Sequence, residues 1–290
     1  MVTTTSQEDP ARQLLLNALE TRWKNYRAEL KLCQDEFSEE AVHDLRVAAR
    51  RMLALLRLLN SIAPLPRLKK LTRVFKTQLD DFDDLRDTQV ILAELSETAQ
   101  ELPQLRDFQK SLQASEARLL RSLRKGLKKL EITETARRIG KTRNVIASEK
   151  SGLAGQALQA VDDSFQRVRQ RHSVVDAARA TTIHRARVAF KSFRYMVEIV
   201  HPLLADFPSD TLKRMNAYQT RMGEIQDAEV FAQTLADFLE HASLSDPEPV
   251  RRYIEQRHAD ALSAYLAERD ELGTFWRATP DQPFPWEKTQ

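Results

Sequence analysis

Two stretches of the sequence share one pattern, in which a histidine is followed three residues later by an arginine and seven residues later by a second cation. This spacing places the three side chains along one side of an α-helix. The pattern consists of His43, Arg46 and Arg50 in "AVHDLRVAARRM" and of His184, Arg187 and Lys191 in "TIHRARVAFKSF", 141 residues later. Arginine forms forked, charge-assisted hydrogen bonds to phosphate oxygens, and lysine supplies a point charge. The predicted chemistry is therefore the binding of a phosphorylated anion.

A second pair of segments repeats at almost the same distance along the chain. "FDDLRDTQV" at 82–90 matches "MGEIQDAEV" at 222–230, 140 residues later. Two separate blocks in nearly constant register indicate an internal duplication. We therefore expect two related units, and we infer a pseudo-two-fold arrangement of the two.

Apolar residues recur with the period of an α-helix, and no segment shows the alternation of a half-buried strand. The predicted fold is all-α, with two tandem pseudo-symmetric four-helix-type bundles. The helices are expected over 8–33, 39–61, 66–81, 86–101 and 103–130, and then over 156–172, 179–203, 209–223, 226–243 and 247–271. A connector at 132–155 can hold further helical turns. The predicted domains are a first repeat at 1–140, a second at 141–275, and a Pro-rich surface tail at 276–290.

Charge is segregated along the chain although the net charge is only +3. Residues 41–76 contain nine lysines and arginines, Arg57 among them, against the single acid Asp44, whereas residues 80–101 contain eight acids against Arg86. A long polyanion would gain from many such cations and from the release of its counterions. For either helix alone, arginines that lay their methylenes on the core are the simpler explanation. A second basic run, "RLLRSLRKGLKK" at 118–129, suits a solvated helix face as well as a binding surface.

Composition and motifs argue against several other classes of protein. The single Cys33 excludes an intramolecular disulfide, and a reducing, cytoplasmic location is expected. No basic and apolar leader and no long apolar run is found, so neither export nor membrane insertion is expected. No Cys/His cluster has zinc spacing and no phosphate-binding or nucleophile motif occurs, so we expect no metal, no cofactor and no catalysis.

The paired motifs resemble the conserved histidine α-helical domain family, abbreviated CHAD. The resemblance covers roughly 10–272 and rests on "VHDLRVAARRM" with "LRDTQV", and on "IHRARVAFKSFRYMVE" with "IQDAEV". It implies a pair of similar four-helix bundles that bind inorganic polyphosphate through basic residues and associate with polyphosphate granules. The ExExK motif of a triphosphatase-like module that some relatives carry is absent, so a free-standing, non-catalytic binding protein is expected.

The resemblance also implies which residues bind, and the two copies differ among them. Arg51 corresponds to Ser192, Arg57 to Glu198 and Lys76 to Asn216, so residues 41–60 are expected to form the stronger half of the site. The implied binding residues are His43, Arg46, Arg50 and Arg51 in the first motif and His184, Arg187, Lys191, Arg194 and Tyr195 in the second. We add Arg57, which falls on the same side of its helix as Arg46 and Arg50; this side is called the cationic edge. From the helices that follow each motif we also add Lys70, Arg73, Lys76, Lys213 and Arg214.

Two other functions stay open from the sequence. In one, His43 or His184 acts as an acid or nucleophile in an enzyme that cleaves or transfers phosphate. In the other, the polyanion is a nucleic acid, which would show similar salt-sensitive binding. A base-reading motif and interleaved aromatic residues for stacking are both lacking, which disfavours nucleic acid.

Overall fold

The computed structural model describes residues 9–148 and 152–289, and within these ranges all regular structure is helical. The prediction of an all-α fold is confirmed. Residues 1–8, on which the expectation of no leader partly rests, and residues 149–151 of the connector lie outside this description. The helices are α1 (Pro10–Asp35), α2 (Glu39–Ile62), α3 (Pro66–Asp81), α4 (Asp83–Glu101), α5 (Arg106–Lys128), α6 (Thr133–Ser148), α7 (Leu153–His172), α8 (Ala180–Val200), α9 (Thr211–Leu239) and α10 (Glu248–Glu268), with short 3-10 helices at Pro103–Leu105, His201–Leu203, Arg269–Thr274 and Pro285–Thr289.

The start of α2 is determined by its local sequence. The Ser38 hydroxyl accepts a hydrogen bond from the Ala41 backbone N–H at 3.1 Å, which satisfies one of the free donors of the first turn. Glu39 and Glu40 follow, where negative charge suits the positive end of the helix dipole. The helix ends shortly before Pro64, which has no backbone N–H to donate. These signals fix which residues of the cationic edge share one helix.

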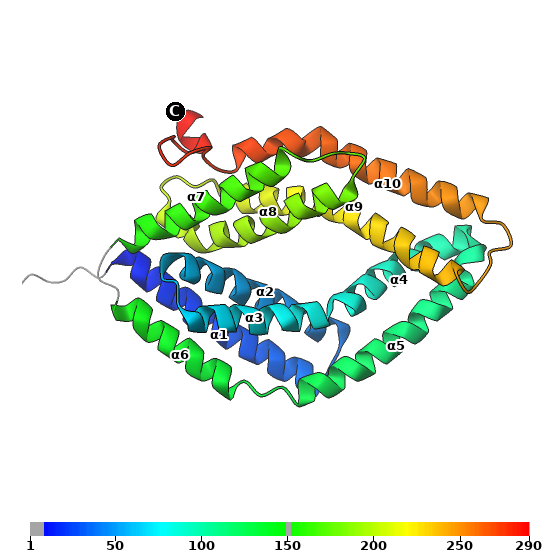
Figure 1. Ribbon diagram of the computed structural model, residues 1–290, viewed down its shortest axis with the longest axis horizontal. Helices are drawn as coiled ribbons and strands as arrows, with labels where there is room; N and C mark the ends of the chain where they lie inside the picture. Colours follow the sequence, from blue (N-terminus) through cyan, green and yellow to red (C-terminus); the bar gives the residue numbers. More distant parts are fainter. Residues whose placement is uncertain (1–8, 149–151, 290) are drawn as a thin grey trace, which may run out of the picture.

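The two halves of the chain repeat one order of packed helices (Figure 1). In the first half α1 packs along α2, α2 along α3, and α4 along α5; in the second, α7 packs along α8, α8 along α9, and α9 along α10. Helices α3 and α4 together therefore correspond to the single helix α9. Helix α6 has no counterpart in this order and lies against α1 and α3.

Two hydrophobic cores join the halves to each other. The larger core includes Leu55 and Leu56 of α2 and Phe190 and Phe193 of α8, all fully buried, and α2 packs against both α7 and α8. A smaller core forms where the ends of α4 and α5 meet those of α9 and α10 (Figure 1, right). The two motif helices, α2 and α8, are thus held side by side at the centre of the molecule. The predicted domain boundary after residue 140 falls within α6.

Helix α9 is continuous where two helices, 209–223 and 226–243, were predicted. Gly223 lies inside the helix and is buried, so its low helix propensity is overcome by packing. In the first half the equivalent segment does break, at Phe82, whose backbone (φ −96°, ψ −5°) separates α3 from α4. Asp83 and Asp84 then occupy the first turn of α4, which favours a new helix start.

The connector predicted at 132–155 holds the complete helix α6. Its buried residues Thr135, Ile139, Thr142 and Ile146 recur every three or four positions and form a stripe against α1 and α3. Gly140, which suggested a break, has open space around it and does not interrupt the helix. The stripe was the signal for a helix here, and the three glycines of the segment 132–155 obscured it.

The C-terminal tail is anchored more firmly than a surface segment. Trp276 is 1% exposed and Phe284 is 7% exposed. The buried carboxylate of Asp162 in α7 accepts a hydrogen bond from Trp276 Nε1 at 2.8 Å and two from the Arg277 guanidinium at 2.9 and 2.6 Å. The expectation that the tail only runs over the surface was therefore wrong for these aromatic residues. No helix in the described part of the chain is long and apolar enough to cross a membrane.

Candidate functional site

A cleft of about 210 Å³ lies where α8 faces α2 and the junction of α3 with α4. Its walls carry cations from both halves of the chain and two carboxylates, Asp80 and Asp83. The phenol ring of Tyr195, which is 8% exposed, forms part of one wall. The duplication thus brings the two cationic edges to one place. The cations of the cleft are Arg50, Arg57, Lys76, Arg187 and Lys191.

The two carboxylates of the cleft are already engaged by cations of the first half. Asp80 Oδ2 lies 2.5 Å from Lys76 Nζ, four residues earlier in the chain. Asp83 Oδ1 lies 3.3 Å from Nη2 of Arg46, which is 5% exposed. Within residues 9–148 and 152–289, Arg50, Arg187 and Lys191 form no ion pair. The cleft therefore has an excess of positive charge that an anion could balance.

The lowered pKa of Lys191 shows that the cations of the cleft are crowded and partly shielded from water. Burial, together with the neighbouring cations Arg50, Arg187 and Arg46, lowers the pKa of Lys191 to about 7, and Asp83 opposes the shift. Burial also lowers the pKa of Arg50 and of Arg187. Positive charges that are crowded and partly desolvated gain from a bound anion, which would favour their protonated forms.

Arg187 differs from Arg46, its equivalent in the first half, because no carboxylate forms an ion pair with it in the described structure, although the nearby Asp227 opposes the lowering of its pKa by burial. The residue equivalent to Asp83 is Gly223, and a Cβ atom placed there would lie 3.5 Å from Arg187 Nε and 3.6 Å from Nη2. Arg187 Nε is buried and has no hydrogen-bond partner. Its guanidinium thus rests on bare backbone with unused hydrogen-bonding capacity, as expected of a group that binds a ligand.

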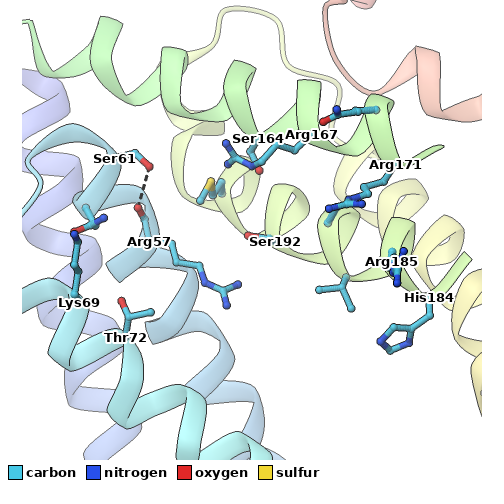
Figure 2. A pocket seen from close by; sticks show the side chains of 15 residues that line it. Arg57, Ser61, Lys69, Thr72, Ser164, Arg167, Arg171, His184, Arg185 and Ser192 are labelled. Atoms are coloured by element: carbon cyan, nitrogen blue, oxygen red, sulfur yellow. Dashed lines mark hydrogen bonds between the residues drawn. The ribbon is translucent and has the colours of Figure 1, made fainter. Parts of the chain in front are cut away.

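A larger groove of about 890 Å³ adjoins the cleft, between the end of α2, the start of α3, α7 and the start of α8 (Figure 2). No carboxylate lines it, and Ser61, Thr72, Ser164 and Ser192 contribute hydroxyl groups. Figure 2 shows cations on both sides of the opening. Arg57, Val188 and Ser192 line both the groove and the cleft, so the two cavities adjoin at these residues. The cations of the groove are Arg57, Lys69, Arg167, Arg171 and Arg185, together with His184.

The two histidines of the repeated pattern occupy different environments. His184 lines the groove, and its Nδ1 lies 2.5 Å from Oε1 of Gln226 in α9. His43 is exposed and lines neither cavity. The structure therefore brings one of the two predicted histidines to the cations. In the described part of the chain no three His, Cys, Asp or Glu side chains are grouped to hold a metal ion.

Arg51 and Arg194, which the family resemblance implied as binding residues, point to a different cluster. The carboxylate of Glu198 lies 3.2 Å from Arg51 Nε, 3.6 Å from Arg22 Nη2 and 4.0 Å from Arg194 Nη1. The Arg194 guanidinium also lies 4.3 Å from the ring centroid of Tyr195. Arg51 and Arg194 therefore share the Glu198 carboxylate, whereas Arg50 and Arg187 of the cleft have no ion pair in the described structure.

The remaining predicted residues lie away from the cations of the cleft. Arg214 donates to Glu271 at 2.8 and 2.9 Å, and its guanidinium lies over the ring of Phe275. Lys70, Arg73 and Lys213 are exposed and line neither the cleft nor the groove. In contrast, Arg50, Arg57, Lys76, Arg187, Lys191, Tyr195 and His184 are gathered around the two adjoining cavities, with Arg46 beside them.

Sequence reasoning missed four cations of the groove: Lys69, Arg167, Arg171 and Arg185. Arg167 and Arg171 stand four residues apart in α7, in the acid-free run "QRVRQRH" at its end, which was the available signal. They were overlooked because they belong to neither repeated motif. Only the packing of α7 beside α8 and α2 shows that they face Arg57 and Lys69.

Comparisons with known proteins agree with this architecture. The family model described as CHAD domain matches residues 11–236. The crystal structure of the CHAD domain from the plant Ricinus communis superimposes with a TM-score of 0.64, covering 91% of this chain and 89% of that one; at 17% identity this likeness concerns the fold. No curated protein matches the chain. With a duplicated helical fold, paired His/Arg helices and a family match over most of its length, the chain belongs to the CHAD domain family.

Proposed function

We propose that this protein binds inorganic polyphosphate, without catalysis, in the cleft between α2 and α8. The observation that carries the proposal is the group of three cations with no ion pair in the described structure, Arg50 from one half and Arg187 and Lys191 from the other. Phosphate oxygens would complete the hydrogen bonds of the guanidinium groups and neutralise the cluster. We further propose that the protein associates with polyphosphate granules in the cytoplasm.

The surroundings of the cations favour polyphosphate over nucleic acid. Single-stranded nucleic acid is usually held by aromatic side chains on which bases stack, beside a basic track for the backbone. Tyr195 is the single aromatic residue among those that line the two cavities. Its ring is mostly buried and is covered on one side by Arg194. A ligand made only of phosphate uses the cations and needs no stacking surface.

The groups around His184 support binding without catalysis. The ring is held by the side-chain amide of Gln226 and not by a carboxylate, which would raise its basicity. The groove around it presents cations and hydroxyl groups but no carboxylate that could act as a general base. The alternative of a phosphate-cleaving enzyme predicts that the pure protein releases orthophosphate from polyphosphate, and that His184→Ala abolishes the release.

A salt titration of polyphosphate binding tests the proposal. The variant Arg50→Ala/Arg187→Ala/Lys191→Ala removes the three cleft cations, and Arg121→Ala/Arg124→Ala/Lys125→Ala removes three exposed cations of α5 as a matched control. We expect the cleft variant to lose binding by on the order of 100-fold and to show a shallower salt dependence, because fewer counterions are released. The control should bind almost as the wild type does.

Competition then separates the two polyanions. Long-chain polyphosphate should displace labelled polyphosphate at far lower phosphate concentration than single-stranded or duplex DNA. Equal affinity of the cleft variant and the α5 control, or stronger competition by DNA, would show that the cleft is not a polyphosphate site.

A further inference from the structure

The groove along α7 has the charge of a ligand site but lies outside the residues that the repeated motifs indicate. Arg167 and Arg171 of α7 and Arg185 of α8 are exposed and form no ion pair in the described structure. They face Arg57 and Lys69 across the groove, with hydroxyl groups between them (Figure 2). A solvated helix face normally carries both signs of charge, whereas this concave surface carries one.

We infer that the α7 groove is an extension site, which holds the phosphates of a long polyphosphate chain that continue out of the cleft past Arg57. This inference rests on the proposed function and adds to it a preference for long chains over short ones. A short chain can occupy the cleft alone, and only a longer chain reaches the α7 cations. Affinity should then increase with chain length through added contacts and counterion release.

The sizes and connection of the two cavities support one continuous path. The cleft, at about 210 Å³, is smaller than the roughly 300–1,000 Å³ of ordinary ligand pockets, whereas the groove of about 890 Å³ lies within that range. Arg57, Val188 and Ser192 border both. A chain leaving the cleft therefore meets Arg57 first and then the cations on either side of the groove.

The equivalent path, past the residue that corresponds to Arg57 in the second half, offers no such continuation. Glu198 stands there in the position of Arg57, and its carboxylate forms ion pairs with Arg22, Arg51 and Arg194. A polyanion on that side would find a carboxylate where Arg57 offers a cation, and it would have to compete with Glu198 for the guanidinium groups. The duplicated fold thus supports an extension on the α7 side alone.

The test compares tripolyphosphate with a long-chain polyphosphate on three proteins. These are the wild type, Arg167→Ala/Arg171→Ala in the groove, and Arg121→Ala/Arg124→Ala on α5, which removes two exposed charges elsewhere. We expect the groove variant to lose about tenfold in affinity for the long chain and almost nothing for tripolyphosphate. Its slope of log affinity against log salt should become shallower by roughly 1, the size expected for one or two lost phosphate contacts. The α5 variant should follow the wild type.

Two results would overturn the extension site while leaving the proposed function in place. One is an equal loss of affinity for both ligands in the groove variant; the other is a long-chain loss no larger than that of the α5 control. Failure of the wild type to bind either ligand would overturn the proposed function and the extension together. Thermal melting of the variants checks folding, and no change is expected because both arginines are exposed.

Discussion

Equivalent arginines in the two halves of this duplicated protein, Arg46 and Arg187, differ in whether a carboxylate pairs with them. In the first half Arg46 is nearly buried and paired with Asp83. In the second half its equivalent, Arg187, lies against the backbone of Gly223 and has a buried Nε without a partner. One copy therefore uses the arginine for structure and leaves it neutralised. The other leaves the arginine without an ion pair in the described structure, while a buried guanidinium nitrogen lacks a hydrogen-bond partner in both copies, Nη1 in Arg46 and Nε in Arg187.

At a second pair of equivalent positions in the described structure, the unpaired cation belongs to the first half and the ion-paired residue to the second. Arg57 of the first half opens onto both cavities, whereas Glu198 of the second half closes a cluster of three arginines. The sequence predicted from this mismatch that residues 41–60 form the stronger half. In the structure the available cations come from both halves, Arg50 and Arg57 from one and Arg187 and Lys191 from the other. The proposed path therefore lies on the side of Arg57, because Glu198 stands at the equivalent position of the second half.

The largest effect should come from giving Arg57 the charge of its counterpart. Arg57→Glu places a carboxylate where the cleft meets the groove. Like charges brought together in a binding interface cost several kcal/mol, so we expect long-chain polyphosphate affinity to fall on the order of 100-fold. Binding is measured by titration calorimetry at constant salt, with thermal melting to confirm the fold.

Arg57→Gln provides the control for Arg57→Glu, because it removes the positive charge without adding a negative one. Its loss should be about tenfold, as for a missing charge-assisted contact. If the two variants bind equally, the charge at the junction is not sensed by the ligand, and the contrast with Glu198 has no functional meaning.

Gly223→Asp makes the second half resemble the first and should have the next largest effect. The space at Gly223 accepts a Cβ atom at ordinary contact distance from Arg187 Nε. The new carboxylate would pair with Arg187 as Asp83 pairs with Arg46. We expect polyphosphate affinity to fall about tenfold because an available cation becomes neutralised. Undiminished affinity would show that Arg187 does not contact the ligand.

Gly223→Ala separates the effect of charge from that of added volume. Alanine is favoured over glycine in a helix interior by about 0.5–1 kcal/mol, so the free energy of unfolding should rise while binding stays unchanged. Denaturant unfolding measures the first quantity and calorimetry the second. Weaker binding by the alanine variant would mean that bare backbone at residue 223 is itself needed.

Much of the fold was predictable because it depends on local spacing. The periodic apolar residues of α2 and α8, the Ser38 cap and the proline stop place both helices within a few residues of their observed ends. Helix α6 was predicted only as a connector that can hold helical turns, and the continuous α9 was predicted as two helices. Packing around the buried Gly223 keeps α9 continuous, whereas Gly140 is exposed and α6 is held by the buried stripe on its other face.

The site was predictable only as far as the repeated motif reaches. Arg50, Arg187 and Lys191 were identified, and the structure brings them to one cleft. Arg51 and Arg194 share the same motif, but their pairing with Glu198 depends on how the halves meet, which spacing along one helix cannot show. Arg167 and Arg171 were missed for the same reason, because α7 joins the site through tertiary packing alone.

Polyphosphate affinity should also change with pH, by less than in the variants above. This change tests whether neighbouring cations lower the pKa of Lys191. Its pKa is about 7 in the free protein, so it is protonated below that pH and increasingly neutral above it. A bound polyanion raises the pKa, and binding above pH 7 must therefore take up a proton. Affinity should be constant at low pH and fall by up to tenfold per pH unit above about 7, until the pKa of the complex is reached.

Lys191→Arg is the control for this pH profile, because arginine stays charged throughout the range. All other titrating groups are the same in both proteins, so the difference between the two profiles isolates Lys191. Calorimetry in buffers of different ionisation enthalpy reports the proton uptake directly. Parallel profiles from pH 6 to 9 would contradict a lysine that titrates near neutrality in the free cleft.

The smallest change in affinity is expected from Glu198→Gln, which removes the carboxylate that pairs with Arg22, Arg51 and Arg194. Arg22, Arg51 and Arg194 would lose their shared partner and become available. We expect only a two- to threefold gain in long-chain affinity, because a pair as exposed as Arg51 with Glu198 is worth little, about 0–1 kcal/mol. The gain should persist in an Arg57→Gln background if the two sides act separately. If the gain disappears in that background, one polyphosphate chain must contact both the region at Arg57 and the region at residue 198, and the two regions would then belong to one binding path.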